Sequence, residues 1–215
     1  MEQRHPLSGL RVLEMGSRTT APYIGKLFTD AGADVLKLES PVGDPFRTWS
    51  ASGASIPDGE DAAWWRFLNA GKRSVTIVLE TDEGKDQFHN LVEETDLILD
   101  DHIPQDAQRL GITYEDIHII SPSTVLASLT YFGTTGPWAN RPANDFILQA
   151  LTGATENRGI PGEEPAACGG ELGDFVAAAL SAPAILAITL ASQKTGTGTH
   201  IDVSQYESRM HAFLT

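Results

Sequence analysis

Asp174 is the residue whose type and setting best suit chemistry in this sequence. It follows a glycine-rich approach and precedes a long apolar run that continues to Thr195. This pattern predicts a helix that begins at Asp174, with the carboxylate at the N-cap position beside free backbone N–H groups. An oriented carboxylate next to amide donors suits nucleophilic attack on a carbonyl. Plain helix capping is the alternative, and the segment taken alone favours it.

Other catalytic and cofactor motifs are missing from the sequence. The turn GSRTTA at 16–21 lacks the second and third glycines of a dinucleotide-binding fingerprint, and no Walker or G-x-S-x-G sequence occurs. The six histidines and the single Cys168 show no metal-ligand spacing, so we expect no metal site. The net charge of −14, from 15 Lys and Arg against 29 Asp and Glu, argues against nucleic acid as a partner.

The composition is that of an ordinary globular domain. Hydrophobic residues make up 41% of the 215 residues, which is enough for one substantial core. The single cysteine permits no intrachain disulfide, and residues 1–10 lack the apolar segment of a signal peptide. No apolar run is both long enough and uniform enough for us to expect a membrane span. These features predict a cytoplasmic protein with no membrane partner.

Short apolar strands alternate with helices along the chain. We expect strands at 11–14, 34–38, 74–79, 96–99, 124–130 and 199–203, and helices at 22–31, 62–67, 81–94, 104–110, 114–120, 145–151 and from 174. This alternation predicts an α/β fold with a doubly wound, mostly parallel sheet and helices on both faces. Ligands bind such sheets outside the carboxyl ends of the strands. We therefore expect Asp174 at that edge, facing the loops after the first and fifth strands.

The chain resembles the class III coenzyme A transferases (CaiB/BaiF type), which include formyl-CoA transferases and α-methylacyl-CoA racemases, over nearly its whole length. The resemblance lies in the order and spacing of LSGLRVLEMG at 7–16, LFTDAGADVLKLESPVGDPFR at 27–47, NAGKRSV at 69–75, RLGITYEDI at 109–117, YFGTTGPW at 131–138, LGDF at 172–175 and KTGTG at 194–198. It implies a Rossmann-like N-terminal domain at 1–203. Residues 204–215 would then begin a helix that leads toward a second domain, because the family's chains are roughly twice this length.

The resemblance implies a function for Asp174. In the family the matching aspartate attacks the thioester carbonyl of an acyl-CoA and then carries CoA as an aspartyl-CoA thioester. A free carboxylic acid takes the CoA in the reverse sequence. The implied activity is a CoA-transferase whose substrates are an acyl-CoA and a carboxylic acid, with no metal.

The resemblance also implies a set of coenzyme-site residues: Thr19, Thr20, Lys72, Arg73, Ile77 and Arg109. Arg109 matches an arginine that holds CoA phosphates, and Ile77 matches an apolar residue near the adenine. The two threonines match the loop that borders the active site. The Lys-Arg pair at 72–73 matches a family hallmark, for which a structural role is the alternative.

Several positions depart from the family's pattern. Ser40 stands where an arginine is usual, and Glu80 stands where a lysine is common. Asp100-Asp101-His102 replaces a usual Glu-Asn-Phe. Lost cations and added acids near a polyanionic ligand predict weak binding of CoA.

Two alternatives to a CoA-transferase remain at this point. The first is a non-catalytic half of a CoA-transferase-like pair that acts as an interaction scaffold. The second is an acyl-CoA racemase, which needs a second base at the position held by Asn144, a residue that cannot take a proton. The resemblance implies a homodimer or pairing with a second CoA-transferase-like chain.

Overall fold

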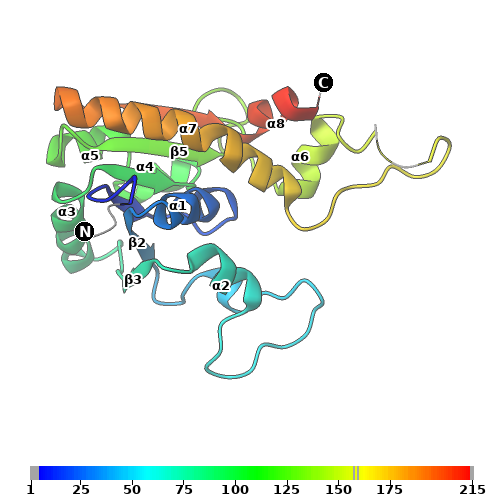
Figure 1. Cartoon of the computed structure of the whole chain (residues 1–215), viewed down its shortest axis with the longest axis horizontal. Coiled ribbons are helices and arrows are strands. Elements are labelled where there is room, and N and C mark those ends of the chain that lie inside the picture. Colours follow the sequence, from blue (N-terminus) through cyan, green and yellow to red (C-terminus); the bar gives the residue numbers. More distant parts are fainter. Residues whose placement is uncertain (1–4, 157, 159, 214–215) are drawn as a thin grey trace.

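The computed structural model describes residues 5–156, 158 and 160–213 (Figure 1). Within these residues a single sheet has the strand order β3-β2-β1-β4-β5-β6, and every neighbouring pair is parallel. The strands are β1 (Arg11–Glu14), β2 (Asp34–Glu39), β3 (Arg73–Thr76), β4 (Leu97–Asp100), β5 (Val125–Thr130) and β6 (His200–Ser204). Two βαβαβ halves meet between β1 and β4, which confirms the predicted doubly wound α/β fold.

Helices cover both faces of this sheet (Figure 1). The helices of the described residues are α1 (Thr20–Asp30), α2 (Ala63–Asn69), α3 (Asp82–Glu93), α4 (Pro104–Leu110), α5 (Tyr114–Ile120), α6 (Asp145–Leu151), α7 (Leu172–Thr195) and α8 (Gln205–Phe213), with a 3-10 turn η1 (Pro45–Arg47). The alternation of side chains along β1 builds a core on each face. Val12 packs with α1 and α7, whereas Leu13 packs with α3, α4 and α5.

Several predicted boundaries differ from the structure by one to three residues. The third strand ends at Thr76 rather than at 79, because residues 78–81 form a turn in which Thr81 Oγ1 accepts from Gly84 N and caps α3. The first helix begins at Thr20, so Pro22 lies in its first turn, where backbone N–H groups lack helical partners anyway. The last long helix begins at Leu172, so Asp174 is its third residue and not its N-cap.

The expectation that no segment could span a membrane was wrong. By length and composition alone, helix α7 is long and apolar enough to do so. Helix α7 has 24 residues and a mean hydropathy of 2.0 over its most apolar stretch, of which 39% is buried in the fold. One side of α7, including Ala178, Ala182 and Ile185, packs into the core shared with α1 and the sheet. Core packing therefore accounts for the apolar character of that side.

Gly198 supplies a test of the packing between the turn after α7 and the entry to β5. A Cβ at Gly198 would lie 2.1 Å from Thr124 O, and Gly198 N donates to Pro122 O at 2.8 Å. We expect Gly198→Ala to lower the free energy of unfolding by about 2–3 kcal/mol, because the backbone must shift. The control is Gly196→Ala, where φ is +71° and the space is open, with an expected loss of about 1 kcal/mol from conformation alone. Equal losses in urea denaturation would contradict the close approach.

Candidate active site

Asp174 lies at the carboxyl edge of the sheet, in the first turn of α7 and beside the loop after β1. Thr20 Oγ1 donates to the backbone oxygen of Asp174 at 3.5 Å, and Thr19 Oγ1 donates to Glu171 Oε2 at 3.0 Å. Tyr131 comes directly after β5. Burial raises the pKa of its phenol to about 12, and the nearby charge of Asp174 contributes. The predicted position facing the loops after the first and fifth strands is therefore confirmed.

Arg209 on α8 is the cation of this site, and no local pattern in the sequence indicates it. Its guanidinium is fully buried and donates to the Asp174 carboxylate and to Asp145 Oδ1, the latter at 2.8 Å. A Cβ on Gly173 would lie 2.6 Å from Arg209 Nη1, so any side chain at this position would displace the guanidinium. A buried arginine between two carboxylates orients both of them.

The surroundings of Asp174 favour the protonated form of its carboxyl group. Burial raises the pKa of Asp174, and although Arg209 lowers it, the Glu171 and Asp145 carboxylates raise it further. A hydrogen bond with the Glu171 side chain acts in the same direction. Two carboxyl groups share one guanidinium and the carboxyl group of Glu171 lies against Asp174, so the pKa of Asp174 stands well above its ordinary value. The proton must leave before this carboxylate can act as a nucleophile.

Glu171 is a second residue that sequence reasoning missed. Among the residues that the structure describes, it is the one non-glycine residue with a positive φ, of 55°, and it occupies the N-cap of α7. Strained backbone of this kind concentrates at functional sites. Its conformation turns the chain into α7 and brings its carboxylate between Thr19 and Asp174.

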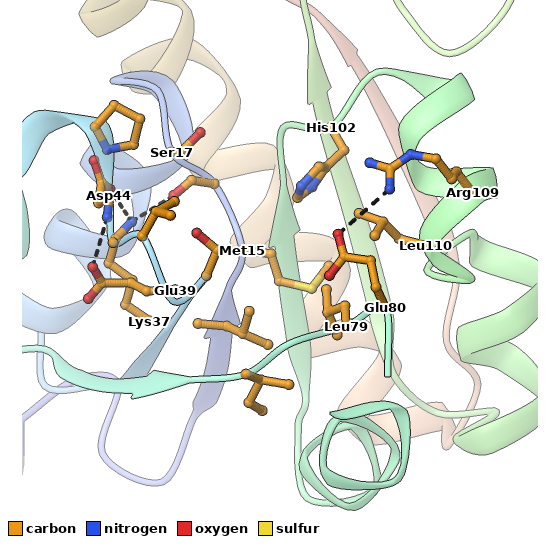
Figure 2. A pocket seen from close by; sticks show the side chains of 17 residues that line it. Met15, Ser17, Lys37, Glu39, Asp44, Leu79, Glu80, His102, Arg109 and Leu110 are labelled. Atoms are coloured by element: carbon orange, nitrogen blue, oxygen red, sulfur yellow. Dashed lines mark hydrogen bonds and ion pairs between the residues drawn. The ribbon is translucent and has the colours of Figure 1, made fainter. Parts of the chain in front are cut away.

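A cavity of about 290 Å³ opens at the same edge of the sheet (Figure 2). It lies between the loop after β1, the segment after β2, the segment after β3 and helix α4. The predicted residues Ile77 and Arg109 both line it, together with Ser40 and Glu80. Arg109 Nη1 lies 3.7 Å from Glu80 Oε1, so the predicted anion-binding arginine already faces an acid.

Asp100 and Asp101 do not line this cavity, contrary to the expectation that they would repel an anionic ligand there. Both are at most 2% exposed. Asp101 accepts hydrogen bonds from the backbone N–H groups of Ser17 at 3.1 Å and Arg18 at 2.8 Å, which holds the loop after β1 in place. Asp100 Oδ1 pairs with His102 Nδ1 at 2.5 Å.

Comparison with known proteins identifies the family. Residues 7–214 match the model of CoA-transferase family III. The chain belongs to this family. It is 33% identical to the succinate–glutarate CoA-transferase of Agrobacterium fabrum, covering 94% of this chain and 51% of that protein. It is also 33% identical to the acetyl-CoA:oxalate CoA-transferase of Acetobacter aceti, covering 97% and 53%.

Solved structures agree with this assignment. A CaiB/BaiF family protein from Brucella suis superposes with a TM-score of 0.90 at 34% identity, covering 97% of this chain and 55% of that one. The chain thus spans about half the length of the family III relatives that it matches.

The remaining predicted residues of this family III chain lie away from the cavity. Lys72 Nζ is buried and donates to Glu14 Oε2 at 2.6 Å and to Pro22 O at 2.8 Å. Arg73 pairs with Asp34 on the surface, with Nη2 2.7 Å from Oδ2. Thr19 and Thr20 lie beside Asp174 instead. The cavity therefore unites two of the six predicted coenzyme residues, and Lys72 has the contacts of a structural residue.

A second hollow of about 440 Å³ borders the Asp174 site. Its lining includes Trp49, Trp64 and Phe146, together with Glu171 and Asp145, the two acids that contact the Asp174–Arg209 pair. The part of the chain that the structure describes contains no group of His, Cys, Asp or Glu side chains arranged to hold a metal ion.

Proposed function

We propose that this chain carries the coenzyme-binding and nucleophilic part of a CoA-transferase that moves CoA from an acyl-CoA to a free carboxylic acid. One observation carries the proposal: the loop at 16–20 contacts both the cavity and the Asp174 site. Ser17 lines the cavity that contains Ile77 and Arg109, and Thr20 hydrogen-bonds the backbone of Asp174. A long ligand bound by its phosphates in the cavity could therefore present its thioester to Asp174.

The proposed reaction begins with attack of an Asp174 oxygen on the thioester carbonyl. The C–S bond breaks, CoA leaves as the thiolate, and a mixed anhydride forms. The thiolate then attacks the Asp174 carbonyl carbon, which releases the donor acid as a carboxylate and leaves an aspartyl-CoA thioester. The acceptor carboxylate reverses these two steps. Backbone N–H groups of the glycine-rich segment before α7 would stabilise the tetrahedral oxyanions.

The substrate class follows from the relatives. Their names give CoA-transferases for succinate, glutarate, citramalate and oxalate, so we propose a carboxylic acid as acceptor and an acyl-CoA as donor. One relative from Chloroflexus aurantiacus is named as the alpha subunit of a succinyl-CoA–L-malate CoA-transferase. Dimerisation, with a second copy or with another family III chain, and a cytoplasmic location belong to the same proposal.

A non-catalytic scaffold is the second candidate. The contact of Arg109 with Glu80 favours it, since the acid opposes the charge of the arginine that is predicted to hold the CoA phosphates. A racemase is disfavoured because Asn144, at the position of the second base, caps α6 by accepting from Ile147 N at 2.9 Å.

Exchange of CoA tests the proposal directly. The chain is incubated with succinyl-CoA and isotope-labelled glutarate, and labelled glutaryl-CoA is measured. Hydroxylamine is added in a parallel sample, and the peptide with Asp174 is examined by mass spectrometry for the hydroxamate that an aspartyl thioester yields. Exchange together with that product supports the enzyme. CoA binding without either result favours the scaffold.

Removing the charge of Glu80 should strengthen CoA binding. Glu80→Gln removes a negative charge from the cavity and leaves Arg109 paired with Asp106 alone. An exposed pair of this kind contributes about 1 kcal/mol or less, so we expect the Kd for CoA to fall by up to about fivefold, and more at low salt. Glu83→Gln, an exposed residue of α3 outside the cavity, is the control with the same change in net charge. Equal effects of both variants in calorimetry would contradict a specific role for Glu80.

A further inference from the structure

We propose that His102 is a phosphate-binding residue of this chain, whose imidazolium donates from Nε2 to a phosphate oxygen of CoA beside Arg109. The inference rests on the proposed coenzyme site and adds to it a cation that the family resemblance does not assign. At this position the resemblance leads to an expected phenylalanine, which has no hydrogen bond to give.

The geometry of His102 is that of an oriented donor. Nδ1 lies 2.5 Å from Asp100 Oδ1, and the backbone N–H of His102 donates to the same oxygen at 3.3 Å. The Asp100 side chain is 2% exposed, so the carboxylate holds the ring from beneath, whereas the ring itself is 30% exposed. His102 lines the cavity on the side of Arg109 and Glu80 (Figure 2). Among the described residues, Nε2 has no hydrogen-bond partner, which leaves it for a ligand.

The charges around the ring keep it protonated. Burial lowers the pKa of His102, but the charge and hydrogen bond of Asp100 outweigh this effect and raise the pKa to about 9. Asp101 also raises it, and Arg18 in the loop after β1 lowers it. Arg109 on α4 and Glu80 before α3 line the same cavity. At neutral pH the ring is therefore an imidazolium with one N–H directed away from its acidic partner.

His102 supplies positive charge to a cavity that has Ser40 and Glu80 where the family commonly has an arginine and a lysine. The positive charge of Arg109 is opposed by Glu80 on the cavity surface. The acidic partner of His102 is instead buried beneath the ring and does not line the cavity. An anion in the cavity consequently meets the imidazolium N–H and not the carboxylate that holds it, an arrangement that favours phosphate.

The pH dependence of CoA binding tests the inference. We expect the Kd of the unmodified chain for CoA to rise about tenfold between pH 7.5 and pH 10, since the free ring loses its proton near pH 9. His102→Gln should weaken binding about tenfold at pH 7.5 and remove most of this pH dependence. Asp100→Asn keeps the shape of the partner and removes its charge, so the rise in Kd should move toward pH 6.5. His89→Gln, an exposed residue of α3 outside the cavity, is the matched control.

The outcomes separate this inference from the proposed function. If the chain binds no CoA at either pH, both the proposed coenzyme site and this inference are wrong. Binding that is unchanged in affinity and pH profile by His102→Gln would overturn the role of His102 and leave the coenzyme site standing. A direct readout is the NMR titration of ¹³C-labelled histidine, in which the His102 signal should titrate near pH 9 and move toward 6.5 in Asp100→Asn. An ordinary histidine pKa for His102 in the unmodified chain would contradict the inference.

Discussion

Replacing Arg209 with methionine is expected to lower the free energy of unfolding by about 3–5 kcal/mol at neutral pH. The guanidinium is fully buried and is shared by the carboxylates of Asp145 and Asp174. Methionine fills much of the same volume but leaves the two acids without their cation, and an uncompensated buried charge is costly. The free energy is measured by urea denaturation.

The control is Arg66→Met on the exposed surface of α2, with an expected change within about 0.5 kcal/mol. The cost of Arg209→Met should shrink as the pH falls, because protons then neutralise the carboxylates that the guanidinium no longer serves. A loss no larger than that of Arg66→Met, or one that does not depend on pH, would show that Arg209 does not hold this site together.

Replacing Asp174 with asparagine is expected to abolish CoA exchange, by at least about a thousandfold. The side-chain amide keeps the shape and can still accept from Arg209, but it cannot form the anhydride or the thioester. Asp86→Asn, an exposed change on α3, should leave exchange unaltered. Retention of exchange within about tenfold in Asp174→Asn would show that another group is the nucleophile.

The same variant should not lose stability, which separates lost chemistry from lost structure. The pKa of Asp174 is raised in the folded chain, so its contribution to stability is present at low pH and disappears as the pH rises through the folded pKa. Asparagine has no proton to lose. We therefore expect Asp174→Asn to be at least as stable as the unmodified chain at pH 8, with an advantage that grows between acidic and neutral pH. A melting temperature lower at pH 8 than that of the unmodified chain would contradict the raised pKa.

The sequence by itself determined the architecture, because its signals are local. Short buried strands and helix caps such as Thr81 and Thr113 place most elements within a few residues of where they lie. The parallel sheet and its helices on both faces follow from that alternation. The position of Asp174 at the carboxyl edge was predictable for the same reason. The start of α7 was not, because the left-handed conformation of Glu171 extends the helix by two residues and has no pattern in the local sequence.

The tertiary structure decided which side chains meet around these elements. Arg209 is 35 residues from Asp174 and 64 from Asp145 along the chain, and no periodicity connects positions so far apart. Asp101 looked like an acid in a phosphate site, yet folding brings it against the backbone of Ser17 and Arg18, 83 residues or more away. His102 carried no signal, because its charge depends on the contact of its ring with Asp100, whose effect on the pKa outweighs that of burial. Spacing in the sequence specifies the backbone, but the pKa and partner of a buried group depend on distances that exist only after folding.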